Sequence, residues 1–394
     1  MSWKETSVMD ERTKFIGRLL SGEKMAPLCR EFGISRTTGH KIWKRYQQNG
    51  IRGIYDRSRA PNKHPNQLPF EVEQVILNLK RERPKWGAPK LRELLSKRYP
   101  DIVLPAISTI HCVLDRNGLV KKKRKRTKFK AVASYLSTPS KPNDLWCTDF
   151  KGQFLLGSKD YCYPLTLTDH ESRFILSCEA LTSTAENPCF SVFEQAFQEY
   201  GLPEAIRSDN GVPFASGNSL WNLTKLSVWW IRLGIKLERI EPGNPQQNGR
   251  HERMHRTLKL EAANPSSKTL LQQQERFDDF VNDFNYERPH QALEMKSPSE
   301  IYQKSAREYK GLPDITYPGY DKTLWISNCG RMCYQKMKVH VSRAFAHQPV
   351  GLKEVESGLW QVDFMSYNLG YFDAESKVFT PQEDPFGIRL DMRV

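Results

Sequence analysis

The stretch that decides the fold is residues 244–259, N-P-Q-Q-N-G-R-H-E-R-M-H-R-T-L-K. Pro245 and the Asn-Gly pair that ends at Gly249 indicate a loop. The residues after Gly249 contain no Gly or Pro, so they predict a helix. Met254 and Leu258 are four residues apart on this helix and can anchor one of its faces to a core.

Another face of the same helix combines one carboxylate with three groups that can carry positive charge. Their spacing of i, i+3, i+4 and i+7 puts them on one side: Glu252, His255, Arg256 and Lys259. Such a set on a rigid helix suits a site that holds a metal ion beside a phosphate backbone. The alternative is a solvated face on which Glu252 simply pairs with Arg256.

Composition narrows the class of protein. A chain of 394 residues is too long for one ordinary core and predicts several domains. The net charge of +15 favours a polyanionic partner, nucleic acid before a membrane surface; a generally basic soluble protein is the alternative. The eight cysteines are scattered and include no Cys-x-x-Cys pair, which indicates reduced core cysteines. With no long apolar segment, the protein is expected to be soluble and cytoplasmic.

The first 55 residues show the pattern of a helix-turn-helix domain. Helices are predicted over 1–20, 25–32 and 36–48, and Gly33-Ile34-Ser35 forms the tight turn before the third, basic helix. In this motif the second of the paired helices presents its first side chains to base edges in the major groove. The residues expected to contact DNA are Arg36, Thr37, Thr38, His40, Lys41 and Lys44. An ordinary helical hairpin is the alternative.

Residues 56–68 are polar, basic and rich in Pro, which predicts a linker. Residues 69–120 predict a second helical unit, interpreted as another helix-turn-helix with or without a wing. Residues 121–134 are a basic linker that opens with K-K-K-R-K-R-T-K-F-K. Such a run repels itself, so it predicts a solvated tether or an arm that contacts phosphates without choosing sequence.

From residue 135 the chain predicts an α/β domain with a mixed sheet, extending to 305. Its first two strands, 145–150 and 154–156, are expected to form a hairpin, and a single helix is expected over 220–233. Beyond it, residues 315–390 contain short β-like runs divided by glycines, which predict a small all-β barrel or sandwich. The fold class is therefore multidomain, with all-α, α/β and all-β parts in that order.

Three carboxylates stand out by their positions in the α/β domain. Asp149 ends a predicted apolar strand, Asp209 follows another where ligand sites of α/β sheets gather, and Glu252 lies on the helix described above. Carboxylates from three separate elements can form an oxygen-rich site, for which Mg²⁺ is the best fit. Asp169 and Glu171 are alternative candidates for metal ligands. Asp169 can instead have a structural role or support the ligands.

These residues carry a family resemblance. W-C-T-D-F-K-G at 146–152, I-R-S-D-N-G-V-P-F at 206–214 and P-Q-Q-N-G-R-H-E-R-M-H-R-T-L-K at 245–259 resemble the catalytic core of DDE transposases. This group includes transposases of bacterial insertion sequences and retroviral integrases, and it has a ribonuclease H-like fold. N-Y-E-R-P-H-Q-A-L at 285–293 resembles the end of that core in insertion-sequence transposases. The zinc-binding module of retroviral integrases has no counterpart here, and helix-turn-helix units take its place.

The resemblance implies a DNA transposase in which Asp149, Asp209 and Glu252 are both the catalytic and the metal-binding residues. They would hold two Mg²⁺ ions, for which Mn²⁺ can substitute. It implies binding to terminal inverted repeats, hydrolysis at the 3′ ends of the element and joining of the 3′-hydroxyl to target DNA by two-metal-ion transesterification. The further residues expected to contact DNA are Asn248, His255, Arg256 and Lys259.

The active form is expected to be a homo-oligomer, at least a dimer on DNA, without a membrane partner and associated with a bacterial nucleoid. Three alternatives remain open, and one of them is an RNA-processing enzyme, which the basic run at 121–130 would suit. The other two are a DNA-binding regulator without catalysis and a nuclease of the same fold that cleaves without joining.

Overall fold

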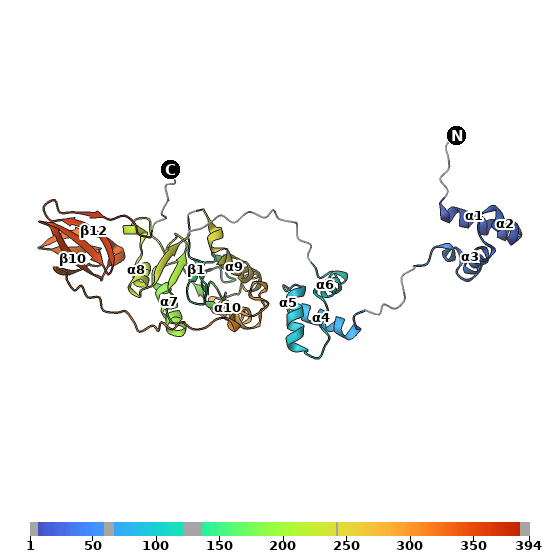
Figure 1. Ribbon diagram of the computed structural model, residues 1–394, viewed down its shortest axis with the longest axis horizontal. Coiled ribbons are helices and arrows are strands. Elements are labelled where there is room, and N and C mark those ends of the chain that lie inside the picture. Colours follow the sequence, from blue (N-terminus) through green and yellow to red (C-terminus); the bar gives the residue numbers. More distant parts are fainter. Residues whose placement is uncertain (1–6, 59–66, 121–135, 242, 387–394) are drawn as a thin grey trace, which may run out of the picture. The chain divides into compact units, whose positions relative to one another are not determined.

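The computed structural model describes residues 7–58, 67–120, 136–241 and 243–386. Its contacts divide the chain into two compact units, Met1–Phe70 and Glu71–Val394, and each is described by itself (Figure 1). The predicted basic arm at 121–130 lies outside the described residues.

The first unit consists of three helices around a small core, as predicted. They are α1 (Val8–Leu20), α2 (Met25–Glu31) and α3 (Arg36–Asn49), followed by a 3₁₀ turn over Gly50–Ile54. Ser35 caps α3 because its hydroxyl accepts the backbone N–H of Thr38 at 3.1 Å. Phe15 of α1 and Leu28 of α2 are almost fully buried between the helices.

Helices α2 and α3 approach each other closely at Gly39. A Cβ atom added there would lie 2.5 Å from Sγ of Cys29 and 2.9 Å from Sδ of Met25. Real Cβ atoms do not come so close to other heavy atoms, so only glycine allows this helix-to-helix distance.

The second unit opens with three more helices, α4 (Phe70–Glu82), α5 (Ala88–Arg98) and α6 (Ile107–Arg116). Their shared apolar contacts include the fully buried Leu95 and Ile110. Residues 67–120 contain helices but no strand, so no wing is present in that described stretch.

A mixed sheet follows, as expected. Its strands are β1 (Trp146–Phe150), β2 (Phe154–Leu155), β3 (Tyr161–Asp169), β4 (Ile175–Leu181), β5 (Ala205–Ser208) and β6 (Lys236–Arg239). The order is β2-β3-β1-β5-β6, with β4 also paired to β3. Strand β1 is antiparallel to β3 and parallel to β5, which is parallel to β6.

The predicted hairpin between β1 and β2 is wrong. Both strands pair with β3, β1 through residues 165–169 and β2 through residues 161–162. Pro164 of β3 has no N–H to donate, and Gly152 bends the chain with a φ of +84°. The residues between β1 and β2 therefore form an irregularity along one partner strand rather than a reversing turn.

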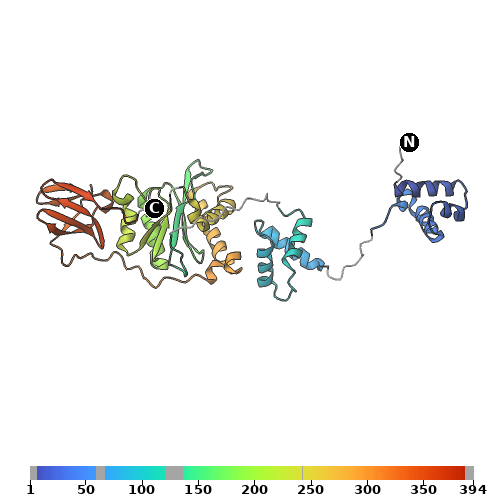
Figure 2. The same ribbon diagram turned by 45° about the horizontal axis from the view of Figure 1, so that its top comes forward.

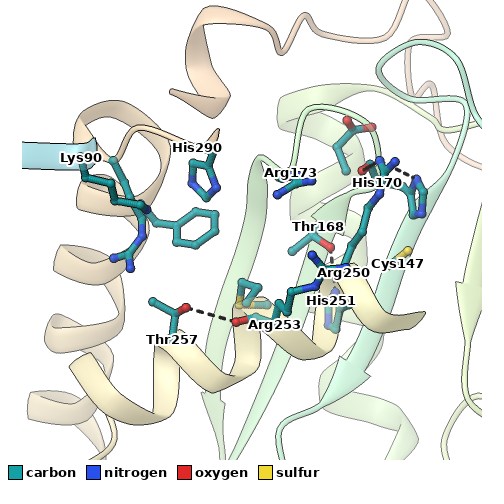
Figure 3. A pocket seen from close by; sticks show the side chains of 14 residues that line it. Lys90, Cys147, Thr168, His170, Arg173, Arg250, His251, Arg253, Thr257 and His290 are labelled. Atoms are coloured by element: carbon teal, nitrogen blue, oxygen red, sulfur yellow. Dashed lines mark hydrogen bonds between the residues drawn. The ribbon is translucent and has the colours of Figure 1, made fainter. Parts of the chain in front are cut away.

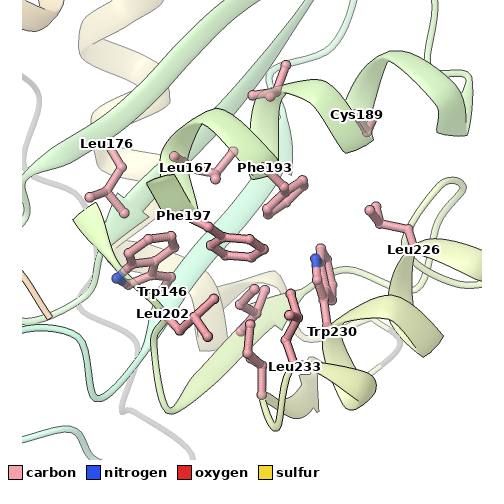
Figure 4. Close-up of a cluster of buried hydrophobic side chains, with 14 of the residues drawn as sticks. Trp146, Leu167, Leu176, Cys189, Phe193, Phe197, Leu202, Leu226, Trp230 and Leu233 are labelled. Carbon is pink, nitrogen blue, oxygen red and sulfur yellow. The ribbon is translucent and has the colours of Figure 1, made fainter. Parts of the chain in front are cut away.

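Helices cover both faces of this sheet (Figures 1 and 2). On one face α7 (Glu186–Tyr200) and α8 (Lys225–Arg232) enclose an aromatic core with β1 (Figure 4). Trp146 stacks on Phe197 there at 5.7 Å between ring centroids. On the other face α9 (Gly249–Glu261) and α10 (Leu270–Asn282) share a second core. Met254 and Leu258 of α9 are buried in that core, which confirms their predicted anchoring role.

The helix expected over 220–233 is shorter than predicted. A 3₁₀ turn at Leu220–Asn222 comes first, and Thr224 then caps α8 through a capping box with Ser227. Helix α8 is apolar on two sides because Trp230 faces the core of the sheet while Val228 and Ile231 join the core of the C-terminal strands.

The C-terminal part is antiparallel, as expected, but it is not the predicted barrel. Strands β7 (Lys322–Trp325), β10 (Pro349–Glu356), β11 (Leu359–Phe364), β12 (Tyr367–Asp373) and β13 (Val378–Pro381) form one sheet, and β8 (Arg331–Tyr334) pairs with β9 (Met337–His340). The order β13-β12-β11-β10-β7 leaves β13 and β7 as the two ends of the larger sheet. Within the described residues these ends do not pair, so the sheet stays open.

The eight cysteines are free, and three of them depart from the expected core position. Cys112, Cys329 and Cys333 are exposed, whereas the other five are buried. None of the described helices has the length and apolar character needed to cross a membrane.

The close approach at Gly39 gives a stability prediction. Gly39→Ala should destabilise the first unit by about 1–3 kcal/mol, because the added methyl group forces α2 and α3 apart. Gly17→Ala is the matched control: its Cβ would meet nothing within 4 Å in the interior of α1, so it should stabilise by about 0.5–1 kcal/mol. Hydrogen exchange of the α1–α3 amides measures both changes. Equal protection in the two variants would contradict the packing described.

Candidate active site

The pairing of β1 with β5 brings two of the predicted carboxylates together. In this parallel pair Trp146 lies opposite Ile206 and Cys147 opposite Arg207. Continuing that register by two residues puts Asp149 beside Asp209, just past the end of β5. Alternate residues of a strand share a face, so both follow Cys147 and Arg207 onto the face that carries α9.

Helix α9 brings the third carboxylate to the same region. Burial, the charge of Asp209 and the charge of Glu252 raise the pKa of Asp149 to about 7. Burial also raises the pKa of Asp209. Glu252 itself is exposed in the first turn of α9. The charges of Asp209 and Glu252 therefore act on Asp149, and the cation of Lys151 offsets them only in part.

A buried polar network fixes α9 against β3. The Thr166 hydroxyl lies 2.8 Å from Nε2 of His251 and 2.6 Å from Nε2 of His255, and it donates to the carbonyl of Asp149. One hydroxyl proton serves one acceptor, so both histidines donate from Nε2. Nδ1 of His251 then accepts from the hydroxyl of Thr168 at 2.7 Å. The network sets the orientation of α9 and thereby that of Glu252.

Two of the residues expected to contact DNA are buried instead. His255 is 5% exposed, and burial together with neighbouring His251 lowers its pKa, so it is neutral. Its Nδ1 faces Oδ2 of Asp149 at 3.7 Å, a contact that is not an ion pair when the ring is neutral. Asn248 is also buried, and its Oδ1 has no hydrogen-bond partner. Arg256 and Lys259 are exposed on the same side of α9 as Glu252.

The competing acidic residues have structural partners. Asp169 is buried and accepts hydrogen bonds from the backbone N–H groups of Asn143 and Ser172 and from the Ser172 hydroxyl. Glu171 forms an ion pair with Arg250 at 2.9 Å. Asp169 therefore ties the end of β3 to the start of the domain, which agrees with the structural role considered for it.

The donor set is chemically suited to a hard divalent ion. Three carboxylates supply the oxygen ligands that Mg²⁺ takes, and a cation would relieve the mutual repulsion around Asp149. In the described stretches no three His, Cys, Asp or Glu side chains are close enough to hold a metal as they stand.

In the first unit the residues expected to contact DNA are all exposed on α3: Arg36, Thr37, Thr38, His40, Lys41 and Lys44. The hydroxyls of Thr37 and Thr38 lie within 2.9 Å of the Ser35 hydroxyl. These two side chains therefore also serve the cap of α3, and their role in binding DNA stays a prediction.

Sequence patterns alone did not single out several residues that shape the site. Thr166 and His251 belong to the buried network, and Arg207 forms a buried ion pair with Glu238 at 2.8 Å. Spacing held a usable signal for His251, because it lies three residues before Met254 and four before His255 on the buried side of α9. Arg207 carried no such signal, since an arginine inside a strand is normally exposed.

Comparison with protein families matches an N-terminal part and a central part of the chain to different models. Residues 139–245 and 233–298 match models described as "Integrase core domain". The chain contains an integrase core domain. A "Helix-turn-helix domain" model matches residues 11–62, and a "Homeodomain-like domain" model matches residues 38–114. The integrase core thus follows domains of the helix-turn-helix type, as the resemblance implied.

Among known proteins, the chain is similar to two uncharacterized insertion-element proteins. One, from IS407 of Burkholderia multivorans, is 25% identical over 70% of this chain and 89% of its own length. The other, from IS476 of Xanthomonas euvesicatoria, is 24% identical over 72% of this chain and 79% of its own. The solved magnesium complex of the HTLV-2 integrase catalytic core covers 41% of this chain and 98% of its own, with 18% identity and a TM-score of 0.33. A score that low supports no argument by itself.

The raised pKa of Asp149 predicts how stability depends on pH. The fold favours the neutral carboxyl, since the pKa of about 7 exceeds the ordinary 3.8. Stability is therefore lost as pH rises from about 4 through 7. Asp149→Asn stays neutral throughout, so without divalent ions it should exceed the wild type by about 1–3 kcal/mol at pH 8 and by little at pH 4.

Urea unfolding at pH 4, 6 and 8 with a chelator measures this difference. The exposed Asp160→Asn change is the control and should follow the wild type at each pH. A constant offset between Asp149→Asn and the wild type would show that Asp149 is not the titrating group.

Proposed function

We propose that this protein is a DNA transposase of the DDE type. It would bind the terminal inverted repeats of a mobile element, hydrolyse the phosphodiester at the 3′ ends and join the freed 3′-hydroxyl to target DNA. The observation that supports this proposal is the β1–β5 register, which leads toward Asp149 and Asp209, together with the charges of Asp209 and Glu252 that act on Asp149.

The three carboxylates would hold Mg²⁺, which when bound activates an attacking oxygen and stabilises the leaving oxygen of a phosphodiester. Residues of the protein would position the helix and the DNA. The buried histidine–threonine network keeps α9, and with it Glu252, against the sheet. Exposed Arg256 and Lys259 would attract the DNA backbone to the side of α9 that bears Glu252.

Recognition of the element ends would belong to the helix-turn-helix domains. The exposed N-terminal half of α3 has the form that enters a major groove. Joining two ends to one target is simplest with a separate active site for each end. We therefore infer an assembly of at least two copies of this chain on DNA.

Loss of a carboxylate should abolish joining but not binding. We expect Asp149→Asn, Asp209→Asn and Glu252→Gln each to reduce strand transfer by at least about a thousandfold, because each removes one of the charges that hold the metal. Binding to the element end should change less than about threefold. The measurement is joining of a pre-cleaved 3′-hydroxyl end to plasmid DNA, with gel-shift titration beside it.

Glu275→Gln is the control, since it removes an exposed carboxylate from α10. Joining by purified Glu252→Gln at the control's rate would reject the transposase assignment. Magnesium-dependent cleavage without joining by the wild type would identify a nuclease of the same fold, and no cleavage at all would favour the DNA-binding regulator.

The helix-turn-helix assignment predicts that substitutions in α3 reduce the affinity for the inverted repeat more than the affinity for unrelated DNA. Arg36→Ala combined with Lys41→Ala should weaken binding to the inverted repeat by tenfold or more, because each good base contact contributes about 1–3 kcal/mol. Binding to unrelated DNA should fall much less. Fluorescence anisotropy with both duplexes measures the two constants, and Lys14→Ala combined with Arg30→Ala removes two exposed cations from α1 and α2 as control. Equal losses on both duplexes would rule out base readout by α3.

A further inference from the structure

A cationic cavity borders the candidate active site on another edge of α9. It has a volume of about 180 Å³, well above the roughly 10–15 Å³ that admits one water. We call it the arginine pocket and define it by these lining residues: Arg173, Arg250, Arg253, Arg288 and His290 (Figure 3). Lys90 of α5 also lines it.

The pocket and the candidate active site share two structural elements. Arg250, Arg253 and Thr257 of α9 are spaced at i, i+3 and i+7, so they follow one edge of the helix that carries Glu252 on another side. Cys147 of β1 also lines the pocket. Asp149 lies two residues further along the same face of β1, about 7 Å away along the strand.

Two of the four arginines form no ion pair, although the charge of Glu171 acts on Arg173. Arg250 pairs with Glu171 at 2.9 Å, and Arg288 pairs with Glu261 at 2.7 Å. Among the described residues neither Arg173 nor Arg253 forms an ion pair. Asp169 lies at the pocket as well, but its oxygens already accept hydrogen bonds from Asn143 and Ser172. The pocket therefore holds an excess of positive charge.

Buried polar atoms in the pocket also lack partners. Nε of Arg173 and Nε2 of His290 are both buried without a hydrogen bond, and His290 is only 9% exposed. Burial and the charges of Arg250 and Arg253 lower the pKa of Arg173. Burial, Lys90, Arg288 and Arg173 lower the pKa of His290 to about 3. The unpaired N–H of Arg173 and the crowded cations both cost free energy that a bound anion would recover, whereas Nε2 of the neutral His290 ring is an acceptor.

We propose that the arginine pocket binds a phosphate group of the DNA on which the neighbouring active site acts. Arginine side chains suit this ligand because their planar guanidinium groups match phosphate oxygens two at a time. The position of the pocket, on the helix and strand that also carry Glu252 and Asp149, would fix the path of one DNA strand across the site. The inference rests on the proposed action on DNA.

The test uses the full chain with Arg173→Gln and Arg253→Gln combined. The control combines Lys225→Gln with Lys236→Gln, which removes two exposed cations from other elements of the integrase core. Inorganic phosphate, compared with chloride at equal ionic strength, should raise the melting temperature of the wild type and the control but not of the pocket variant. Binding to a duplex of arbitrary sequence should weaken about tenfold at 0.1 M salt in the pocket variant, with a salt slope lower by about one.

Each other result overturns the proposal. If phosphate still raises the melting temperature of the pocket variant, phosphate binds elsewhere on the protein. If that rise is lost but the affinity for the duplex is unchanged, the pocket binds free phosphate only. If the double variant does not fold, Arg253→Gln alone, on an exposed side chain, should lose part of both effects. Neither readout needs catalysis, so failure here is separate from failure of Glu252→Gln to abolish joining.

Discussion

The parallel pairing of β1 with β5 is the constraint on which the rest of the integrase core depends. The register of Cys147 opposite Arg207 decides which residues meet at the carboxyl ends of the two strands. A slip of one residue would turn Asp149 or Asp209 to the opposite face of the sheet. It would also move Trp146 out of the aromatic core that it forms with Phe197. Packing on one face of the sheet thus fixes the positions of the carboxylates on the other.

Helix α9 carries the third carboxylate, and polar side chains are buried between this helix and the sheet. Apolar contacts of Met254 and Leu258 hold the helix to the sheet, but they alone would tolerate rotation and sliding. The hydrogen bonds of His251 and His255 to Thr166 have direction, so they select one orientation. That orientation puts Arg253 at the arginine pocket and Glu252 on another, exposed edge of the helix. One helix therefore serves both sites through different edges.

Much of this arrangement could be predicted from the sequence, because periodicity and punctuation report local structure directly. The helix that begins at Gly249 and the three-helix unit at the N-terminus are predicted in this way. The roles of Asp149, Asp209 and Glu252 are implied by a family resemblance and stay a prediction. The errors concern contacts between distant residues. The pairing of β2 with β3 instead of β1 depends on a partner strand that local pattern does not reveal. The spacing of His255 predicts a solvated face of the helix. In the fold His255 is buried against Thr166 of β3, a contact that the local sequence pattern does not reveal. The residues that define the arginine pocket come from three separate segments, so no motif could have indicated it.

The most direct test of this account maps the metal site by cleavage of the chain itself. Fe²⁺ would replace Mg²⁺ in the purified protein, and peroxide with ascorbate would then generate radicals that cut the backbone next to the bound ion. The account predicts cuts near residues 149, 209 and 252 together, all suppressed by excess Mg²⁺ and all lost in Asp209→Asn. Cuts at only one of these segments, or at positions outside them, would contradict the claim that the sheet register and α9 build one site from three carboxylates.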